Sequence, residues 1–218
     1  MSESKSIVKI LRPKLSFDLS VLELSEKNLS DYASISMTLI KECSLENYEI
    51  EKVSFSETIF KNVQLTNVSL QNSEFTDVRF ENCALSNVDL MDSSLHRVEF
   101  INCKLIGINL SESTLRNVLF DQCNGQYGFF RFIDCKQVAF DHCQLRSSDF
   151  QGSIFSKVEF KETDLTQCQM SGVKLKGMDL CSCNIEGMGV RIEDVFGAIV
   201  TSAQAMSLSS LLGIVIKG

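Results

Sequence analysis

An apolar residue recurs at every fifth position of this chain between residues 33 and 190, and no insertion interrupts the pattern. Every residue whose number is a multiple of five, from Ile35 to Val190, is Leu, Phe, Ile, Met or Val, except Gly125 and Cys135. A small or medium side chain stands two residues before each of these positions, and the other three positions are mostly polar. A helix requires apolar spacings of three and four and a strand requires two, so neither explains five. The pattern predicts a solenoid, whose units bury their apolar sides against one another.

A second period of twenty residues lies on top of the first. The residues at positions 60, 80, 100, 120, 140 and 160 are all Phe, and a neighbouring column that begins at Leu45 is mostly Leu. Four pentapeptides therefore make one coil, and like side chains stack from coil to coil. Residues 33–190 predict an all-β solenoid, a quadrilateral β-helix of about eight coils, with stacked Phe and Leu columns as its core.

The corners of the predicted coils carry residues that tolerate left-handed backbone angles. Corner sites follow each central apolar residue by two positions, from residue 37 to residue 187. Of these 31 sites, eight are Asn, five are Gly and two are Asp. These residue types adopt positive φ most readily, which a tight turn at every corner requires. The corner composition thus supports four-sided coils.

Residues 1–32, before the repeat, are predicted to form an N-terminal cap. A solenoid end needs covering, because an unpaired strand edge invites aggregation. We expect Ile7 to Leu24 to cover the exposed edge of the first coil.

Residues 191–218, after the repeat, are predicted to form a C-terminal segment. Thr201 or Ser202 begins a short helix over Ala203 to Leu212, and Gly213 ends it. A short apolar strand over 214–216 follows. The apolar side chains of this segment suit either a monomeric cap or the contact of a symmetric dimer. They are Met206, Leu208, Leu211, Leu212, Ile214 and Ile216.

The nine cysteines and two histidines do not form a pattern typical of catalysis or metal binding. Six cysteines share one column of the twenty-residue period, and side chains in a straight line cannot converge tetrahedrally on zinc. Val63 occupies the same column, so we interpret these cysteines as small buried hydrophobes. His96 and His142 fall on outward positions, without a pair for metal binding or a base for a nucleophile. We expect no enzymatic activity, no cofactor and no metal. The cysteine column is Cys43, Cys83, Cys103, Cys123, Cys143 and Cys183.

The chain also lacks the features of a secreted or membrane protein. No apolar run approaches the roughly 18 residues of a membrane span, and the first residues do not have the composition of a signal peptide. Many free thiols suit a reducing compartment. We therefore expect a cytoplasmic protein without membrane contact.

Gly125 is the main defect of the repeat, because it removes a side chain from the Leu column. Gly128 follows at an inward small-residue position, and Tyr127, Phe129 and Phe132 stand nearby. One interpretation is local repacking, in which a neighbouring ring fills the void. The alternatives are a bend in the rod or a surface aromatic that touches a partner.

The formal net charge of −7 argues against direct nucleic-acid binding, because DNA-binding proteins present cations to phosphates. The coil side that contains the Phe column carries eight acids against four bases, and the side of Ile50 and Leu70 carries six against two. The side of Ile35 and Phe55 is net positive. Such charged faces are often merely solvated. Alternatively, an acidic rod would be steered toward a cationic groove.

Several motifs resemble a known family. Cys83-Ala84-Leu85-Ser86-Asn87 and Thr163-Asp164-Leu165-Thr166-Gln167 resemble the A(D/N)LXX signature of pentapeptide-repeat proteins. The tail from Ala203 to Ile216 and the irregular stretch from Cys123 to Phe140 resemble Qnr-type quinolone-resistance proteins, in a Gram-positive-like form without loop insertions. The resemblance implies a right-handed quadrilateral β-helix that dimerises by its C-terminus. It also implies a protein that binds DNA gyrase and topoisomerase IV as an imitation of a DNA duplex and reduces quinolone poisoning.

Taken together with the resemblance, the count of charges makes the acids of the Phe-column side candidates for binding the enzyme. If two rods join at their C-termini, a cationic saddle of the enzyme should meet the acids along this side. The alternative is a structural or scaffolding repeat protein without a topoisomerase target. The candidate partner-binding acids are Glu81, Glu99, Asp121, Asp141, Glu159 and Asp179.

Overall fold

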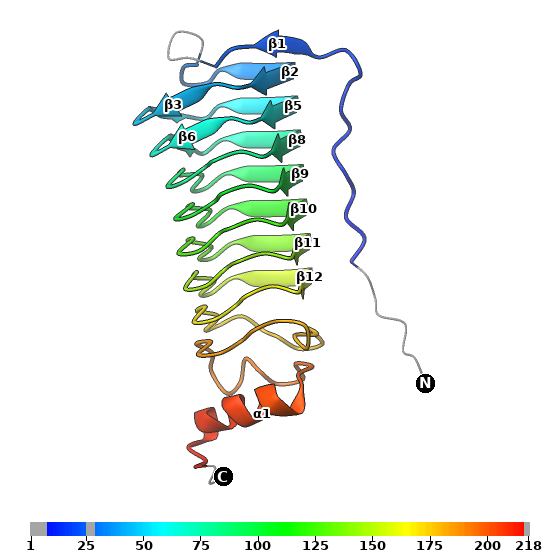
Figure 1. Cartoon of the computed structure of the whole chain (residues 1–218), viewed down its shortest axis with the longest axis vertical. Coiled ribbons are helices and arrows are strands. Elements are labelled where there is room, and N and C mark those ends of the chain that lie inside the picture. Colours follow the sequence, from blue (N-terminus) through cyan, green and yellow to red (C-terminus); the bar gives the residue numbers. More distant parts are fainter. Residues whose placement is uncertain (1–7, 25–28, 216–218) are drawn as a thin grey trace.

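The protein is a β-solenoid, seen in a computed structural model that describes residues 8–24 and 29–215 (Figure 1). Its large parallel sheet has the strand order β1-β2-β5-β8-β9-β10-β11-β12, and two small sheets pair β3 with β6 and β4 with β7. The chain ends in helix α1 (Ser202–Leu208) and the 3-10 helix η1 (Ser209–Leu212). The strands are β1 (Ser20–Leu22), β2 (Ser34–Lys41), β3 (Ser44–Glu46), β4 (Glu49–Glu51), β5 (Ser54–Lys61), β6 (Gln64–Thr66), β7 (Ser69–Gln71), β8 (Glu74–Glu81), β9 (Ser94–Ile101), β10 (Thr114–Asp121), β11 (Asp134–Asp141) and β12 (Ile154–Lys161).

The strand register confirms the predicted coil of twenty residues. From β2 to β12, every pair in the register of the large sheet joins residues twenty positions apart, as Phe100 with Phe120 and Phe120 with Phe140. Seven coils contribute a strand to this sheet. The eighth predicted coil continues the winding without a strand, through isolated parallel bridges such as that between Gln169 and Gly189.

Stacked phenylalanine rings form one wall of the core. Along the column from Phe60 to Phe160, consecutive ring centroids lie 4.5, 4.8, 4.9, 4.6 and 4.9 Å apart, and no interplanar angle exceeds 14°. All six rings are buried. The spacing follows the separation of about 4.8 Å between paired strands, so the backbone ladder itself imposes the stack.

The corners adopt the left-handed conformation that their residue types predict. Every corner site from Met37 to Gly187 except Ser182 has a positive φ. Asparagine corners also bond to one another along the rod axis: Asn87 Nδ2 donates to Asn67 Oδ1, and Asn67 Nδ2 donates to Asn47 Oδ1, both at 3.1 Å. A side chain that tolerates positive φ thus also joins adjacent coils.

The cysteine column serves the packing role predicted for it. The thiol of Cys123 lies 3.3 Å from the carbonyl oxygen of Phe100, and Cys143 Sγ lies 3.4 Å from that of Phe120. Thr163 makes the same bond to Phe140 at 3.1 Å, and Val63 fills the same column without a donor, so the column requires a small side chain rather than a thiol. All nine cysteines are free thiols, and burial raises the pKa of the Cys168 thiol to about 11.

Local repacking fills the space at the two glycines. Leu145 of the next coil, rather than a ring, lies closest to the place of a Gly125 side chain, and the Phe130 ring lies closest to that of Gly128. A Cβ atom on Gly128 would lie 2.6 Å from Phe130 Cε2, and one on Gly125 would lie 2.9 Å from Leu145 Cδ2. Phe130 stacks on Phe150 with centroids 4.6 Å apart. The strand register runs unbroken past this position, and in Figure 1 the stack continues straight from β9 to β12. The side chains of Tyr127, Phe129 and Phe132 are exposed.

The N-terminal segment only partly caps the rod, in contrast to the prediction for Ile7 to Leu24. Strand β1 pairs with β2 and closes the first edge, and Leu24 is buried in the core. Residues 8–18, here called the strap, instead run along the outside of the large sheet, beside the rod (Figure 1). Pro13 lacks an amide hydrogen and favours extended backbone, so this stretch is poorly suited to lengthen the ladder. Ile7 lies outside the described residues.

The C-terminal helix follows its sequence signals. Thr201 caps α1 in a capping box: the Thr201 side chain accepts a bond from the Gln204 amide, and Gln204 Oε1 accepts one from the Thr201 amide at 2.8 Å. Gln204 Nε2 also donates to the carbonyls of Leu180 and Cys183, which fixes the helix to the last coil. Gly213 ends η1 with φ 70°. The strand predicted over 214–216 is absent at residues 214 and 215, and Ile216 lies outside the described residues.

Candidate partner-binding surfaces

Two rows of outward side chains flank the Phe column on the outer surface of the large sheet. The pre-Phe row consists of the residues that precede each phenylalanine, and the post-Phe row consists of the residues that follow it. The strand register places the members of each row on adjacent strands. From β8 to β12 the pre-Phe row is Arg79, Glu99, Leu119, Ala139 and Glu159, and the post-Phe row is Glu81, Ile101, Asp121, Asp141 and Lys161.

The strap covers the pre-Phe row, and Glu99 is consequently buried. Glu99 is 0% exposed, although it stands on the outer surface of β9. Its Oε2 atom lies 2.8 Å from Arg79, and its Oε1 atom lies 3.5 Å from Arg12 of the strap without a hydrogen bond. Glu159 accepts a bond from the Val8 amide at 3.2 Å. While the strap is docked, Glu99 is not open to a partner, contrary to the expectation for this residue.

The post-Phe row remains uncovered but is partly neutralised by its own cations. Glu81 pairs with Lys61 on the preceding coil at 2.8 Å, and Lys161 lies 3.2 Å from Asp141. The half-buried Asp121 carboxylate makes no hydrogen bond or ion pair with the residues that the structure describes. Among the predicted acids of this row, Asp121 therefore offers the most available charge.

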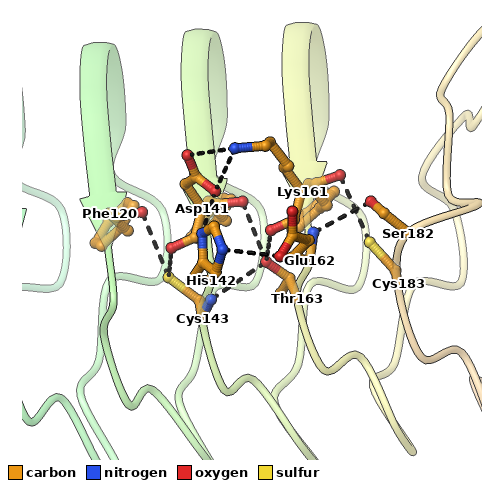
Figure 2. A network of polar contacts seen from close by, with 11 residues as sticks. Phe120, Asp141, His142, Cys143, Lys161, Glu162, Thr163, Ser182 and Cys183 are labelled. Atoms are coloured by element: carbon orange, nitrogen blue, oxygen red, sulfur yellow. Dashed lines mark hydrogen bonds and ion pairs between the residues drawn. The ribbon is translucent and has the colours of Figure 1, made fainter.

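Asp141 belongs to a polar network across three coils (Figure 2). His142 Nδ1 lies 2.7 Å from Asp141 Oδ1, and His142 Nε2 lies 2.8 Å from Glu162 Oε2. The Glu162 amide donates to Ser182 Oγ at 3.1 Å. Exposed pairs of this kind contribute little stability individually, typically about 0–1 kcal/mol. Lys161, which also contacts Asp141, is the cation of this network that offsets part of the negative charge of the last coils.

Asp179, the last predicted acid, lies beyond the large sheet. It is exposed, and one of its oxygens accepts a bond from the Cys181 amide at 3.0 Å. The six predicted acids therefore do not form one continuous surface. Three lie in the post-Phe row, two lie under the strap, and Asp179 stands in the coil after β12.

The corner beside the pre-Phe row is a second polar line, which sequence reasoning did not identify. Arg97 binds Asp77 on the preceding coil through two bonds of 2.5 and 2.6 Å, and the Lys14 amide donates to the same carboxylate at 2.8 Å. Burial raises the pKa of Asp77, but the bonds from Arg97 and Lys14 outweigh it and hold the pKa below its ordinary value. Farther along the corner, Asn117 and Gln137 also bond to the strap.

A second candidate surface is an apolar groove at the C-terminal end. The groove has a volume of about 350 Å³ and lies between the last turn of the rod, with Val195 and Phe196, and the helices α1 and η1. Phe196 is 74% exposed. Leu208 and Leu211 pack partly against the core of their own chain, whereas the other described members of the predicted dimer set are exposed: Met206, Leu212 and Ile214. Ile216 is outside the described residues.

The described residues show no group of three or more His, Cys, Asp or Glu that could hold a metal ion. Within the same residues, neither α1 nor any other helix has the length and apolar composition needed to cross a membrane.

Comparison with protein families identifies the repeat. A model of the pentapeptide repeat region matches residues 33–95, 73–150 and 93–166, and a model of pentapeptide repeats in eight copies matches residues 159–187. The chain belongs to the pentapeptide-repeat family. A search of curated proteins found no match for this pentapeptide-repeat chain.

Several solved structures resemble this pentapeptide-repeat rod. Full-length QnrB1, a plasmid-mediated fluoroquinolone resistance protein, is 17% identical over 84% of this chain and 99% of its own, with a TM-score of 0.39. HetL, from the cyanobacterium Nostoc and involved in heterocyst differentiation regulation, is 13% identical over 81% and 93%, with a TM-score of 0.34. The mannuronan C-5 epimerase AlgE4 A-module of Azotobacter vinelandii is 11% identical over 76% and 74%, with a TM-score of 0.34. At these values the likenesses do not indicate a function.

Proposed function

We propose that this protein is a Qnr-type imitation of DNA that binds DNA gyrase or topoisomerase IV and protects them from fluoroquinolones. The tail from Ala203 to Ile216 and the net charge of −7 support the proposal. The observation that carries it is the open post-Phe row, where the Asp121 carboxylate has no partner among the described residues and faces outward beside the stacked rings.

The dimensions of the rod suit this role. From β2 to β12 the large sheet spans six strand separations of about 4.8 Å, or about 29 Å. This length corresponds to about nine base pairs at roughly 3.4 Å per pair along one strand of DNA. A rigid acidic surface of this size is attracted to a cationic groove, mainly through its rate of association.

A C-terminal homodimer would double that length. The groove beside α1 and η1 presents Phe196, Leu212 and Ile214 to solvent, and apolar surfaces of this kind mark interaction sites. A twofold axis would bring the same patch of each copy together, which is the usual geometry of soluble dimers.

The test is a gyrase supercoiling assay, with and without a fluoroquinolone, using the purified full chain. We expect the protein to inhibit supercoiling at high concentration and to protect it from the drug at lower concentration. The same assay with topoisomerase IV decatenation separates the two targets. If the protein neither inhibits nor protects either enzyme, the proposal is wrong.

The alternative is a scaffolding protein without a topoisomerase target, and the cross-coil ion pairs favour it. Lys61 with Glu81 and Lys161 with Asp141 use acids of the exposed row to hold adjacent coils together. Acids that are paired with lysines of adjacent coils stabilise the rod but present less net negative charge to a partner. A co-purified protein that is not a topoisomerase would support this second function.

A further inference from the structure

The strap contacts five successive coils in regular steps. Its amides donate at every third residue: Val8 to Glu159, Leu11 to Asn117 and Lys14 to Asp77, at 3.2, 3.1 and 2.8 Å. The two intervening coils contribute one contact each. Gln137 Nε2 donates to the Lys9 carbonyl at 2.9 Å, and Glu99 faces Arg12.

This regularity has a geometric cause. Three residues of extended chain advance about 9 to 10 Å, whether the backbone is β or polyproline II. Two coils of the rod advance about 9.6 Å. An extended peptide that runs parallel to the rod axis therefore presents an amide to every second coil in register.

The rod recognises the strap mostly through its backbone. Side-chain oxygens of Glu159, Asn117 and Asp77 accept from amides, so the sequence of the peptide matters little at these points. The exception is Arg12, which faces the buried Glu99, whose Oε1 atom has no hydrogen bond. Leu119 and Ala139 lie between Glu99 and Glu159 in the same row and offer an apolar floor. The surface thus fits an extended peptide with a cation opposite Glu99.

The strap is also held in a way that permits release. Within the described residues, 8–18 make no backbone–backbone hydrogen bond with the rod, unlike β1, which joins the sheet through β2. The Arg12 side chain is 72% exposed despite its ion pair. Segments with few buried contacts open locally at low free energy compared with the core.

We propose that the pre-Phe row and its corner form a binding site for an extended basic peptide, which the strap occupies in cis as an exchangeable occupant. A basic segment of a partner takes the same place when the strap leaves. The inference does not rest on the proposed function, because the site is defined by a peptide of this chain and not by a topoisomerase.

A charge-reversal variant of the full chain tests the proposal. Arg12→Glu places a carboxylate beside the buried Glu99 where a guanidinium now stands, and should release the strap, because a like charge next to the buried Glu99 is repelled where the cation was attracted. The matched control is Lys9→Glu. It makes the same change of charge in the same segment, but the exposed Lys9 side chain has no ion pair with the rod in the described structure.

Two measurements are made on each full-length protein. Amide hydrogen exchange by NMR reports docking, and a fluorescent synthetic peptide of residues 8–18 reports whether the site is available. A tether gives the strap an effective concentration of about 1 mM, so a free peptide with a Kd of about 0.1 mM meets roughly tenfold competition in the wild type. We expect the Arg12→Glu variant to bind the peptide about tenfold more tightly than either the wild type or Lys9→Glu.

The exchange pattern gives an independent signature. In the wild type and in Lys9→Glu, the amides of Val8, Leu11 and Lys14 should be protected while those of Ile10 and Arg12 exchange freely. Arg12→Glu should lose this protection. If these amides are unprotected in the wild type, the strap is not docked in solution. If Arg12→Glu loses the protection but does not bind the peptide more tightly, the row is not a peptide-binding site.

Discussion

Truncating one ring of the Phe column should cost this protein a large part of its stability. Phe120 is 1% exposed, and its ring stacks between those of Phe100 and Phe140 at 4.9 and 4.6 Å. Its edge-to-face neighbour Phe130 lies 6.5 Å away at 89°. Phe→Ala changes in cores cost about 3–5 kcal/mol, and the cost is greatest where neighbours cannot collapse into the cavity.

The surroundings of Phe120 place the expected loss near the top of that range. Phe100 and Phe140 are fixed by strand pairing on both sides, and Phe130 is already packed against Gly128. We therefore expect Phe120→Ala to lower the free energy of unfolding by about 4–5 kcal/mol, out of the roughly 5–15 kcal/mol usual for a domain.

Urea unfolding followed by far-UV circular dichroism measures the effect, with the slope of the transition checked for loss of two-state behaviour. Phe129→Ala is the matched control, because Phe129 is an exposed phenylalanine near the same coil and its loss should cost within about 0.5 kcal/mol. A loss below about 2 kcal/mol for Phe120→Ala, at unchanged slope, would refute the argument that the column cannot relax.

Three further predictions concern the surfaces. The double variant Asp121→Lys/Asp141→Lys should weaken gyrase binding, and most strongly at low salt. The control double variant Lys136→Glu/Lys157→Glu, on the basic side, should bind gyrase equally or more tightly. Equal losses in the two folded variants would show that the charge pattern does not direct binding. Leu212→Asp should be a monomer by light scattering, with an unchanged β-sheet signal in circular dichroism. The control Met37→Asp, at an exposed corner of the other end of the rod, should remain a dimer. If Leu212→Asp is still a dimer, Leu212 is not part of the interface. The pKa of Asp77 is depressed, so its contribution to docking of the strap should be fully present above about pH 5 and be lost as the pH falls through the folded pKa below 3.8. Arg97 binds the same carboxylate, and His96 beside Arg97 has its pKa lowered by burial. A Lys14 amide whose protection factor stays constant to about pH 2 would contradict this.

The repeat could be predicted from the sequence because its determinants are local and periodic. A Phe column, a left-handed corner and the capping box at Thr201 each depend on residues at fixed offsets along the chain. The cross-coil ion pairs are also predictable in principle, since Lys61 and Glu81 are twenty residues apart. A total of charges for each coil side does not predict them, because an ion pair depends on the row and the coil that each charge occupies.

The position of the strap could not be predicted in this way. Its contacts join residues as far apart as Val8 and Glu159, and no local pattern in residues 8–18 specifies where an extended segment will lie. The same contacts reverse the exposure of Glu99, which the alternation along β9 correctly assigns to the outer surface. Alternation predicts which way a side chain points from its strand but not what covers it afterwards.

Docking of the strap and binding of a partner are linked if they use the same row. By thermodynamic reciprocity, a partner that needs the pre-Phe row is weakened by the docked strap and displaces it with the same coupling free energy. If a partner contacts only the post-Phe row, with Asp121 at its centre, its affinity does not depend on whether the strap is docked. Gyrase inhibition by Arg12→Glu and by Lys9→Glu therefore distinguishes the two modes. Stronger inhibition by Arg12→Glu alone assigns the enzyme to the covered row, because both variants change the net charge equally. Equal inhibition by the two variants assigns it to the open row.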